Sequence, residues 1–367
     1  MISASDHCAD MLYASGFRAP DPFVLVEADG KRCLLLSDLE VDRGRHEARV
    51  DHVVSYSEFE KAIASGKKKT PSYAKVVAEF VRHYGGKRVA VSSDFSIGLF
   101  RALKKQNLRL RPAKGALFPE REFKTSEEIR KLSAALRVAE SGLERAMEIL
   151  KASTIRKDGK LQWSRRILTS EILRSEMDIA VIRAGGEARG DTIVACGDEA
   201  CDPHARGAGP LLANSLIILD IFPRSLKSGY FGDITRTVVR GQASPEQRRL
   251  WEVCLAGQEK AFAELVPGAK GGVLQKGIRD FFAEQGYPTE QHEGRWRGFF
   301  HGLGHGLGLE IHEAPRIGAT TLAAGQVVTV EPGIYWPGVG GVRHEDVVVM
   351  TNTGHRLLTK FPKALEI

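Results

Sequence analysis

The sequence predicts an α+β protein of two domains: a smaller N-terminal α/β domain over residues 1–122 and a larger, strand-rich domain over residues 123–367. Three observations support this prediction. The 367 residues are enough for two domains with a large buried core. The composition, 43% hydrophobic and 27% charged, is that of a globular protein. A proline-containing, charged segment at residues 111–124 separates alternating strands and helices from a region of paired strands.

The N-terminal region has the pattern of a small sheet covered by helices. Apolar runs at residues 23–26 and 33–36 flank an Asp29-Gly30 turn and predict a hairpin. Residues 73–83 carry apolar side chains at helical spacing, and residues 89–91 predict a short buried strand. Because strands and helices alternate, we expect a mixed sheet with helices packed on it.

The larger region begins with a predicted helix. Thr125 and Glu128 can form a capping box at its start, and its apolar stripe runs to about Leu150. Further helices are expected over residues 164–177, 245–265 and 272–285.

Apolar strands that carry acids dominate the rest of this region. Strands are expected at residues 192–195, 215–220, 233–238, 327–331 and 341–349. Asp220 and Asp233 are 13 positions apart, and Glu331 and Glu345 are 14 positions apart. Each pair places one acid at the end of an apolar strand and another on the returning strand, so the two hairpins resemble an internal repeat.

A stretch at residues 301–313 contains His301, His305 and His312, with glycine at every second position from 302 to 308. Histidines four apart could bind zinc from one face of a helix. The glycines argue against a helix, because each costs about 1 kcal/mol relative to alanine. We therefore expect a tight loop that leads into a strand over residues 307–312 and lets the backbone approach a ligand or metal.

Acids at the ends of apolar strands are costly unless something positive meets them. Four carboxylates and one imidazole suit two hard or borderline divalent ions, and such a pair can activate a shared water as hydroxide. The alternative is four unrelated acids in salt bridges. Alternation along the last strand puts Arg343 and Glu345 on one side and Asp346 on the other. Asp346, Glu310 and Glu313 are therefore interpreted as structural or surface acids.

Taken together, these motifs resemble those of the metallopeptidases with the pita-bread fold, which include methionine aminopeptidases, Xaa-Pro aminopeptidases and prolidases. Residues 301–313 match the proline-peptidase signature of that family, and residues 229–237, 330–333 and 343–346 are further matches. The resemblance covers residues 125–367. It is weaker over residues 1–120, where residues 13–17 are similar to the start of the creatinase-like N-terminal domain of proline-specific members.

The resemblance implies a ligand set for two divalent ions. Asp220 would bind one ion, His305 and Glu331 would bind the other, and Asp233 and Glu345 would bridge both. Glu331 would also handle the proton of the attacking water. The ions would be manganese first of all, with cobalt, zinc or iron as alternatives.

Other residues would act on the substrate. His204 matches the substrate histidine of the family, and His301 and His312 match the pair that lines the substrate site and steadies the tetrahedral intermediate. Arg343 would support the second bridging ligand. The chain departs from the family in one turn: the segment after Asp220 is about two residues longer than usual, and Phe222 replaces the usual glycine.

The implied activity is hydrolysis of the N-terminal Xaa-Pro bond of peptides or dipeptides through a metal-bridging hydroxide. Alternatives are a same-fold aminopeptidase of other specificity, similar to methionine aminopeptidase, or a non-catalytic peptide-binding relative. Relatives in the family imply a homodimer.

Composition disfavours other classes of protein. The net charge of +7 is mild, residues 67–69 form the only tight basic run, and no basic stripe with stacking aromatics predicts nucleic-acid binding. No apolar run approaches the roughly 18 residues of a membrane helix, and residues 1–10 lack the pattern of a signal peptide. The five cysteines are odd in number and scattered, which predicts reduced thiols and a cytoplasmic protein. Cys196, Cys201 and His204 lack the spacing of a zinc knuckle.

Overall fold

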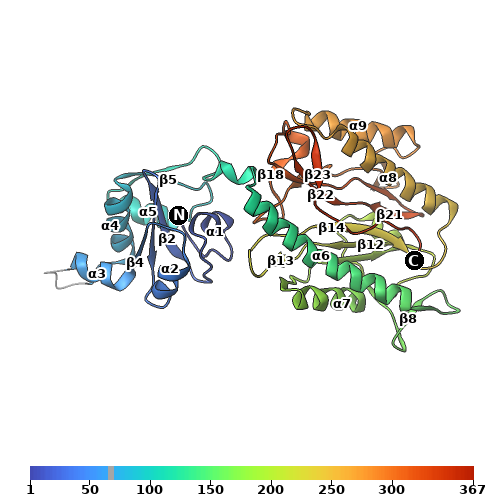
Figure 1. Ribbon diagram of the computed structural model, residues 1–367, viewed down its shortest axis with the longest axis horizontal. Helices are drawn as coiled ribbons and strands as arrows, with labels where there is room; N and C mark the ends of the chain where they lie inside the picture. Colours follow the sequence, from blue (N-terminus) through green and yellow to red (C-terminus); the bar gives the residue numbers. More distant parts are fainter. Residues whose placement is uncertain (65–69) are drawn as a thin grey trace. The chain divides into compact units, whose positions relative to one another are not determined.

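The computed structural model describes residues 1–64 and 70–367, so the basic run at residues 67–69 lies outside the described residues. The chain forms two compact units, Met1–Arg121 and Glu122–Ile367, and each combines helices and strands (Figure 1). Over the described ranges, no helix is both long and apolar enough to cross a membrane.

The N-terminal unit contains a four-stranded sheet with strand order β1-β2-β3-β4. Its strands are β1 (Ile2–Ser3), β2 (Phe23–Ala28), β3 (Lys31–Leu36) and β4 (His52–Ser55). The predicted hairpin is confirmed: β2 pairs antiparallel with β3, and the turn residues Asp29 and Gly30 have φ of 51° and 75°. Positive φ at both central residues is what a tight hairpin turn of this hand requires.

Helices and a second small sheet complete this unit. The helices are α1 (Ala9–Ser15), α2 (Val41–Glu47), α3 (Tyr56–Ala64), α4 (Tyr73–Gly85) and α5 (Ile97–Lys105). Strands β5 (Arg88–Val91) and β6 (Arg109–Pro112) pair in parallel. The predicted helix at residues 73–83 is confirmed in α4, which buries Val76, Val77 and Phe80. The segment expected as a linker instead contributes to β6 and to a 3₁₀ turn at Pro119–Glu122.

The C-terminal unit is built from two similar halves. In the first half, a sheet of order β11-β12-β14 (Ile193–Cys196, Leu216–Ile221, Ile234–Val239) packs against α6 (Ser126–Ala152) and α7 (Ser170–Arg183). The capping box of Thr125 and Glu128 is present at the start of α6 as predicted. Buried side chains such as Leu143, Met177 and Ile217 form the core of this half.

The second half contains a five-stranded sheet of order β18-β17-β19-β22-β23. These strands are β17 (His305–Gly306), β18 (Glu313–Arg316), β19 (Val327–Val330), β22 (Asp346–Met350) and β23 (His355–Leu357), next to the hairpin of β20 (Gly333–Trp336) and β21 (Gly340–Arg343). Helices α8 (Pro245–Glu264) and α9 (Gly271–Glu284) lie over this half (Figure 1), and a second core contains Leu250, Phe282 and Val328. The halves meet where the Glu345 amide donates to the Thr235 carbonyl at 3.2 Å.

The C-terminal unit also contains small sheets of two or three short strands. They are β7 (Thr154–Ile155) and β9 (Arg166–Ile167) on either side of β8 (Leu161–Trp163), β10 (Gly186–Glu187) with β13 (Arg224–Ser225), and β15 (Glu290–His292) with β16 (Arg295–Arg297). Two further 3₁₀ turns span Gly197–Cys201 and Ile317–Ala319.

Three element boundaries differ from the predictions. Helix α7 begins at Ser170, because Ser164 and Arg165 form the turn between β8 and β9 and Thr169 caps the helix. The strand expected over residues 307–312 is wrong: β17 ends at Gly306, and bends lead to β18. The strand expected over residues 341–349 is interrupted at residues 344–345, because β21 pairs with β20 whereas β22 pairs with β19.

Candidate metal centre

A pocket of about 760 Å³ lies where the two halves of the C-terminal unit meet. Residues of both sheets line it, and it receives every side chain for which a metal or substrate role was expected from the sequence. These are His204, Asp220, Asp233, His301, His305, His312, Glu331, Arg343 and Glu345.

The two hairpins deliver the four acids to this pocket. Asp220 lies in β12, and Asp233 directly precedes β14, which pairs antiparallel with β12. Glu331 directly follows β19, and Glu345 directly precedes β22, which pairs antiparallel with β19. The repeat seen in the sequence therefore corresponds to two strand pairs that present their acids at equivalent ends.

His305 brings an imidazole into the acid cluster. Its Nε2 atom is 3.2 Å from Glu331 Oε1 and 3.7 Å from Asp233 Oδ2. One potential ligand atom each from Asp233, His305 and Glu345 lies within 4.8 Å of the other two. All three side chains are buried. Oxygen and nitrogen donors at these separations surround a space that one ion can occupy.

The charges of the cluster are only partly compensated within the protein, because Arg343 pairs with Asp220 alone among the four acids. Burial, followed by the charges of Glu345 and Asp220, raises the pKa of Asp233 well above its usual value. Burial and the charges of Glu331 and Asp220 likewise raise the pKa of Glu345. The buried Oδ1 atom of Asp220 finds no hydrogen-bond partner in the described part of the chain. A cation in this space would remove both defects, so the donor set fits divalent metal ions.

Glu331 stands apart from the other carboxylates. Burial alone would raise its pKa, but the hydrogen bond and charge of His305, together with His301 and Arg343, lower the pKa to about 2. The group is thus a carboxylate at neutral pH.

Two threonines orient the carboxylates. Thr235 Oγ1 donates to Glu345 Oε2 at 2.8 Å, and Thr329 Oγ1 donates to Glu331 Oε1 at 3.2 Å. The Thr329 hydroxyl also accepts the amide of His305 at 3.1 Å. Sequence reasoning did not assign roles to these threonines. The sequence feature that could have identified them is their two-residue spacing from Asp233 and Glu331, which puts each threonine on the same strand face as an acid.

A chain of hydrogen bonds runs behind the pocket from Asp220 to His301. Arg343 donates to Asp220 Oδ2 at 2.6 Å and to the Tyr335 hydroxyl at 2.8 Å. Because that hydroxyl accepts from Arg343, its proton is available to His301 Nε2 at 2.9 Å. His301 Nδ1 then carries a proton and donates a hydrogen bond to the Gly302 carbonyl at 2.9 Å. Burial lowers the pKa of His301 to about 4, which agrees with this neutral tautomer.

Arg343 therefore contacts Asp220 directly, and it reaches Glu345 only through Thr235, whose hydroxyl accepts from Arg343 Nε at 3.4 Å. Tyr335, which the sequence analysis did not single out, links Arg343 to His301. It is four residues after Glu331 on the next strand, so no local pattern connects it to the glycine-rich stretch.

His312 and His204 have freer rings than His301. The His312 ring is edge-to-face with His305 at 4.4 Å between centroids, and no hydrogen bond to it is found over the described ranges. His204 is exposed at the pocket, where its backbone amide donates to Asp202 Oδ1 at 3.1 Å. These rings can reach a molecule in the pocket without breaking a bond within the protein.

The acids interpreted as structural lie outside the cluster. Asp346 is buried and accepts from Arg236 at 2.7 Å and from Lys363 at 2.5 Å. Arg236 also donates to the Glu345 carbonyl at 2.6 Å, so this ion pair fixes the backbone behind a pocket acid. Glu313 pairs with Lys124 at 2.6 Å in a buried contact. That contact holds the loop that carries His312.

The sequence predictions did not include the pocket residue Arg316, and they gave no role to the pocket residue Phe222. Arg316 in β18 is exposed at the pocket and has no ion pair with any residue that the structure describes. Phe222, two residues after Asp220, also lines the pocket. Arg316 could have been found as the only cation within four residues of His312, although its exposure to the pocket depends on the bends after β17.

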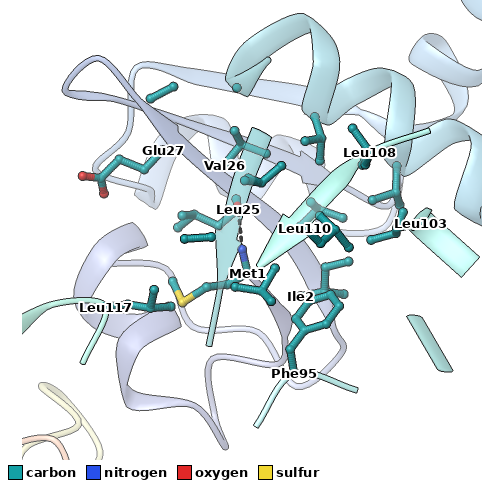
Figure 2. A pocket seen from close by; sticks show the side chains of 18 of the residues that line it. Met1, Ile2, Leu25, Val26, Glu27, Phe95, Leu103, Leu108, Leu110 and Leu117 are labelled. Atoms are coloured by element: carbon teal, nitrogen blue, oxygen red, sulfur yellow. Dashed lines mark hydrogen bonds between the residues drawn. The ribbon is translucent and has the colours of Figure 1, made fainter. Parts of the chain in front are cut away.

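Another hollow, of about 380 Å³, lies in the N-terminal unit. Its walls are mostly aliphatic, as Figure 2 shows for Leu25, Val26, Leu103 and Leu110. The amino group of Met1 donates to the Leu25 carbonyl there at 2.6 Å. Among the described residues, the only cluster of potential metal ligands is the one around His305. We therefore assign the chemistry to the C-terminal pocket.

Cys201, which was weighed with His204 as part of a zinc knuckle, is buried, and burial raises the pKa of its thiol to about 12.

Comparison with known proteins adds the family context. Residues 130–352 match the Metallopeptidase family M24, and residues 4–122 match the Creatinase/Prolidase N-terminal domain. An Xaa-Pro dipeptidase of Pyrococcus horikoshii is 30% identical over 298 residues, which cover 79% of this chain and 78% of the relative.

Solved structures agree with these matches. An X-Pro aminopeptidase of Thermotoga maritima has a TM-score of 0.81 at 26% identity, and the match covers 100% of this chain and 96% of that one. An Xaa-Pro dipeptidase of Bacillus anthracis also has a TM-score of 0.81 at 26% identity, covering 98% and 93%. The expected two-domain, pita-bread architecture is thereby confirmed.

Proposed function

The chain belongs to metallopeptidase family M24, in its pita-bread branch of Xaa-Pro aminopeptidases and prolidases, and from this premise we propose that it hydrolyses the bond between the first residue and proline in Xaa-Pro dipeptides. The observation that carries the proposal is the pocket that combines the buried His305 ring, 3.2 Å from the Glu331 carboxylate, with the exposed rings of His204 and His312. A methionine aminopeptidase-like specificity is not favoured by the relatives.

We assign the metal ligands as expected from the sequence. Asp220, Asp233, His305, Glu331 and Glu345 would hold two divalent ions, a role supported by the burial of all of them except the half-buried Glu331 and by the raised pKa of Asp233 and Glu345. When bound, such ions supply Lewis-acid activation of water and of the peptide carbonyl. Manganese is the first metal to test, with cobalt, zinc and iron as alternatives.

The protein's own residues supply the proton transfers. The Glu331 carboxylate accepts a proton from the attacking water and delivers it to the proline nitrogen as the C–N bond breaks. This delivery matters because the amide nitrogen is a poor leaving group until it is protonated. The His312 ring can donate to the carbonyl oxygen as negative charge develops there. His204 contacts the peptide, and His301, held by Tyr335, forms part of the substrate wall.

Charged side chains of the pocket can orient a bound dipeptide. Arg316 on β18 lines the pocket and attracts the carboxylate of a dipeptide, which directs the first residue of the dipeptide toward the metal ligand Asp220. A dipeptide carries this carboxylate on its second residue. This contact favours dipeptides over longer peptides, whose second residue has no carboxylate.

The remaining assignments rest on the sequence. We propose residues 1–122 as the creatinase-like N-terminal domain and residues 123–367 as the catalytic domain. Reduced thiols support a cytoplasmic location. We also propose a homodimer, which the family resemblance of the sequence implies.

The function is tested by comparing matched peptides. The ratio of kcat/KM for Ala-Pro to that for Ala-Ala, measured with one metal, should exceed one by at least about tenfold, because a pocket shaped for the ring discriminates on this scale. Met-Ala should be hydrolysed poorly. A ratio at or below one would remove the proline assignment and leave the metallopeptidase.

The Arg316→Gln variant tests the preference for dipeptides. We expect its kcat/KM for Ala-Pro to fall roughly tenfold or more, since a charge-assisted contact to the substrate carboxylate is lost. Hydrolysis of Ala-Pro-amide, which has no carboxylate, should change little. Arg279→Gln on α9 is the matched control, because Arg279 is an exposed arginine that does not line the pocket. Equal losses on both substrates would contradict the assignment of Arg316.

A further inference from the structure

The turn between Asp220 and Asp233 is an ordered part of the pocket wall. Its residues Arg224 and Ser225 form β13, which pairs antiparallel with Glu187 and Gly186 of β10. The Leu226 amide donates to the Gly185 carbonyl at 3.0 Å and extends this pairing. The residues by which the turn is longer than usual are thus built into a strand pair.

Additional hydrogen bonds close the turn on itself. The Ser225 amide donates to the Tyr230 carbonyl at 2.8 Å, and the Gly232 amide donates to the Pro223 carbonyl at 2.9 Å. The buried Arg224 side chain donates to the Gly229 carbonyl at 3.2 Å. Phe222 is therefore held between β12 and β13 by fixed backbone on both sides.

The Phe222 side chain occupies a defined place in the pocket. It lines the wall beside Asp220, and Ile193, which pairs with Asp220 across β11 and β12, lines the same pocket. A narrow hollow of about 10 Å³, lined also by Val181 and Thr192, borders Phe222 as well. Phe222 thus borders both the main pocket and this narrow hollow.

The first residue of the substrate lies against the part of the pocket wall formed by Phe222 and Ile193. This step rests on the proposed function, in which Arg316 holds the substrate carboxylate and the first residue is thereby directed toward Asp220. The side chain of that first residue then lies next to Phe222 and Ile193. An aromatic ring held rigidly there leaves less room than the glycine usual at this position.

We propose that Phe222 is a specificity-determining residue that restricts the first residue of the substrate to small side chains. Glycine and alanine fit in front of the phenyl ring, whereas leucine and phenylalanine collide with it. Overpacking a rigid site is costly, so the exclusion acts on binding and on turnover alike.

The test measures kcat/KM for Ala-Pro, Leu-Pro and Phe-Pro in the wild type and in Phe222→Ala. We expect the wild type to prefer Ala-Pro over Leu-Pro by at least about tenfold, and Phe222→Ala to reduce that preference at least about tenfold. Leu226→Ala is the matched control, because this exposed leucine lies in the same turn and does not line the pocket. Its Ala-Pro to Leu-Pro ratio should equal that of the wild type.

A binding measurement keeps the inference testable if turnover is lost. Calorimetric titration with L-alanine and L-leucine, and the same experiments on Phe222→Leu, should show relatively tighter leucine binding as residue 222 becomes smaller. An unchanged alanine-to-leucine preference in Phe222→Ala, or a wild type that favours Leu-Pro, would overturn the proposal. Failure of the proposed function would look different: no Xaa-Pro dipeptide would be hydrolysed, whereas the binding preference would still respond to residue 222.

Discussion

Glu331→Gln should lower kcat for Ala-Pro by at least about 10²-fold, the scale of a lost acid–base catalyst. The substitution keeps the size of the side chain but removes its charge and its capacity to accept a proton. The carboxylate lies 3.2 Å from His305 and accepts from Thr329 at the same distance, so its position is set by two contacts. A glutamine can keep both contacts, and the fold should survive.

The measurement combines proline release, metal content and circular dichroism. Metal content is needed because Glu331 has two proposed roles, and a variant that binds both ions yet does not turn over isolates the proton-transfer role. Glu310→Gln is the matched control, since Glu310 is an exposed glutamate outside the acid cluster. Its kcat should remain within about twofold of the wild type, as is usual for surface substitutions. Near wild-type turnover in Glu331→Gln would mean that the residue does not act in the reaction.

Local patterns predicted the parts of the site that depend on one strand or one turn. Asp220 and Glu345 could be placed because an acid next to an apolar strand is recognisable from its neighbours alone. The same alternation separated Arg343 from Asp346, which the structure finds in the pocket and in a buried pair with Arg236 respectively. Helix α6 was predictable because its capping box is local.

Features that depend on distant partners were not predictable. The interruption at residues 344–345 occurs because neighbouring strands join different partners, whereas no glycine or proline between residues 342 and 349 marks a break in the sequence. Tyr335 gains its role only when Arg343 and His301 reach its hydroxyl from two other segments. The loop after Gly306 is held in part by the buried pair of Lys124 and Glu313, whose members are 189 positions apart.

Prolonged chelation should abolish hydrolysis of Ala-Pro, and adding back one suitable divalent metal should restore it. The same treatment should lower the thermal unfolding temperature, because chelation leaves Asp233 and Glu345 buried beside like charges. Binding to the folded state alone stabilises it by about 2.7 kcal/mol when the ligand is at 100 times its Kd. Recovery of Tm and recovery of activity should therefore follow the same metal titration. Full activity of demonstrably metal-free protein would refute the assignment.

Three histidine variants locate this dependence within the site. His305→Ala should lose metal, because its Nε2 atom lies within 3.7 Å of both Glu331 and Asp233. His312→Ala and His204→Ala should keep the metal and lower kcat/KM, because neither side chain belongs to the acid cluster that His305 joins. Their Tm should still rise when metal is added, whereas that of His305→Ala should respond less. Equal metal loss in all three variants would mean that the imidazoles share one role, and the division between ligand and substrate contacts would have to be withdrawn.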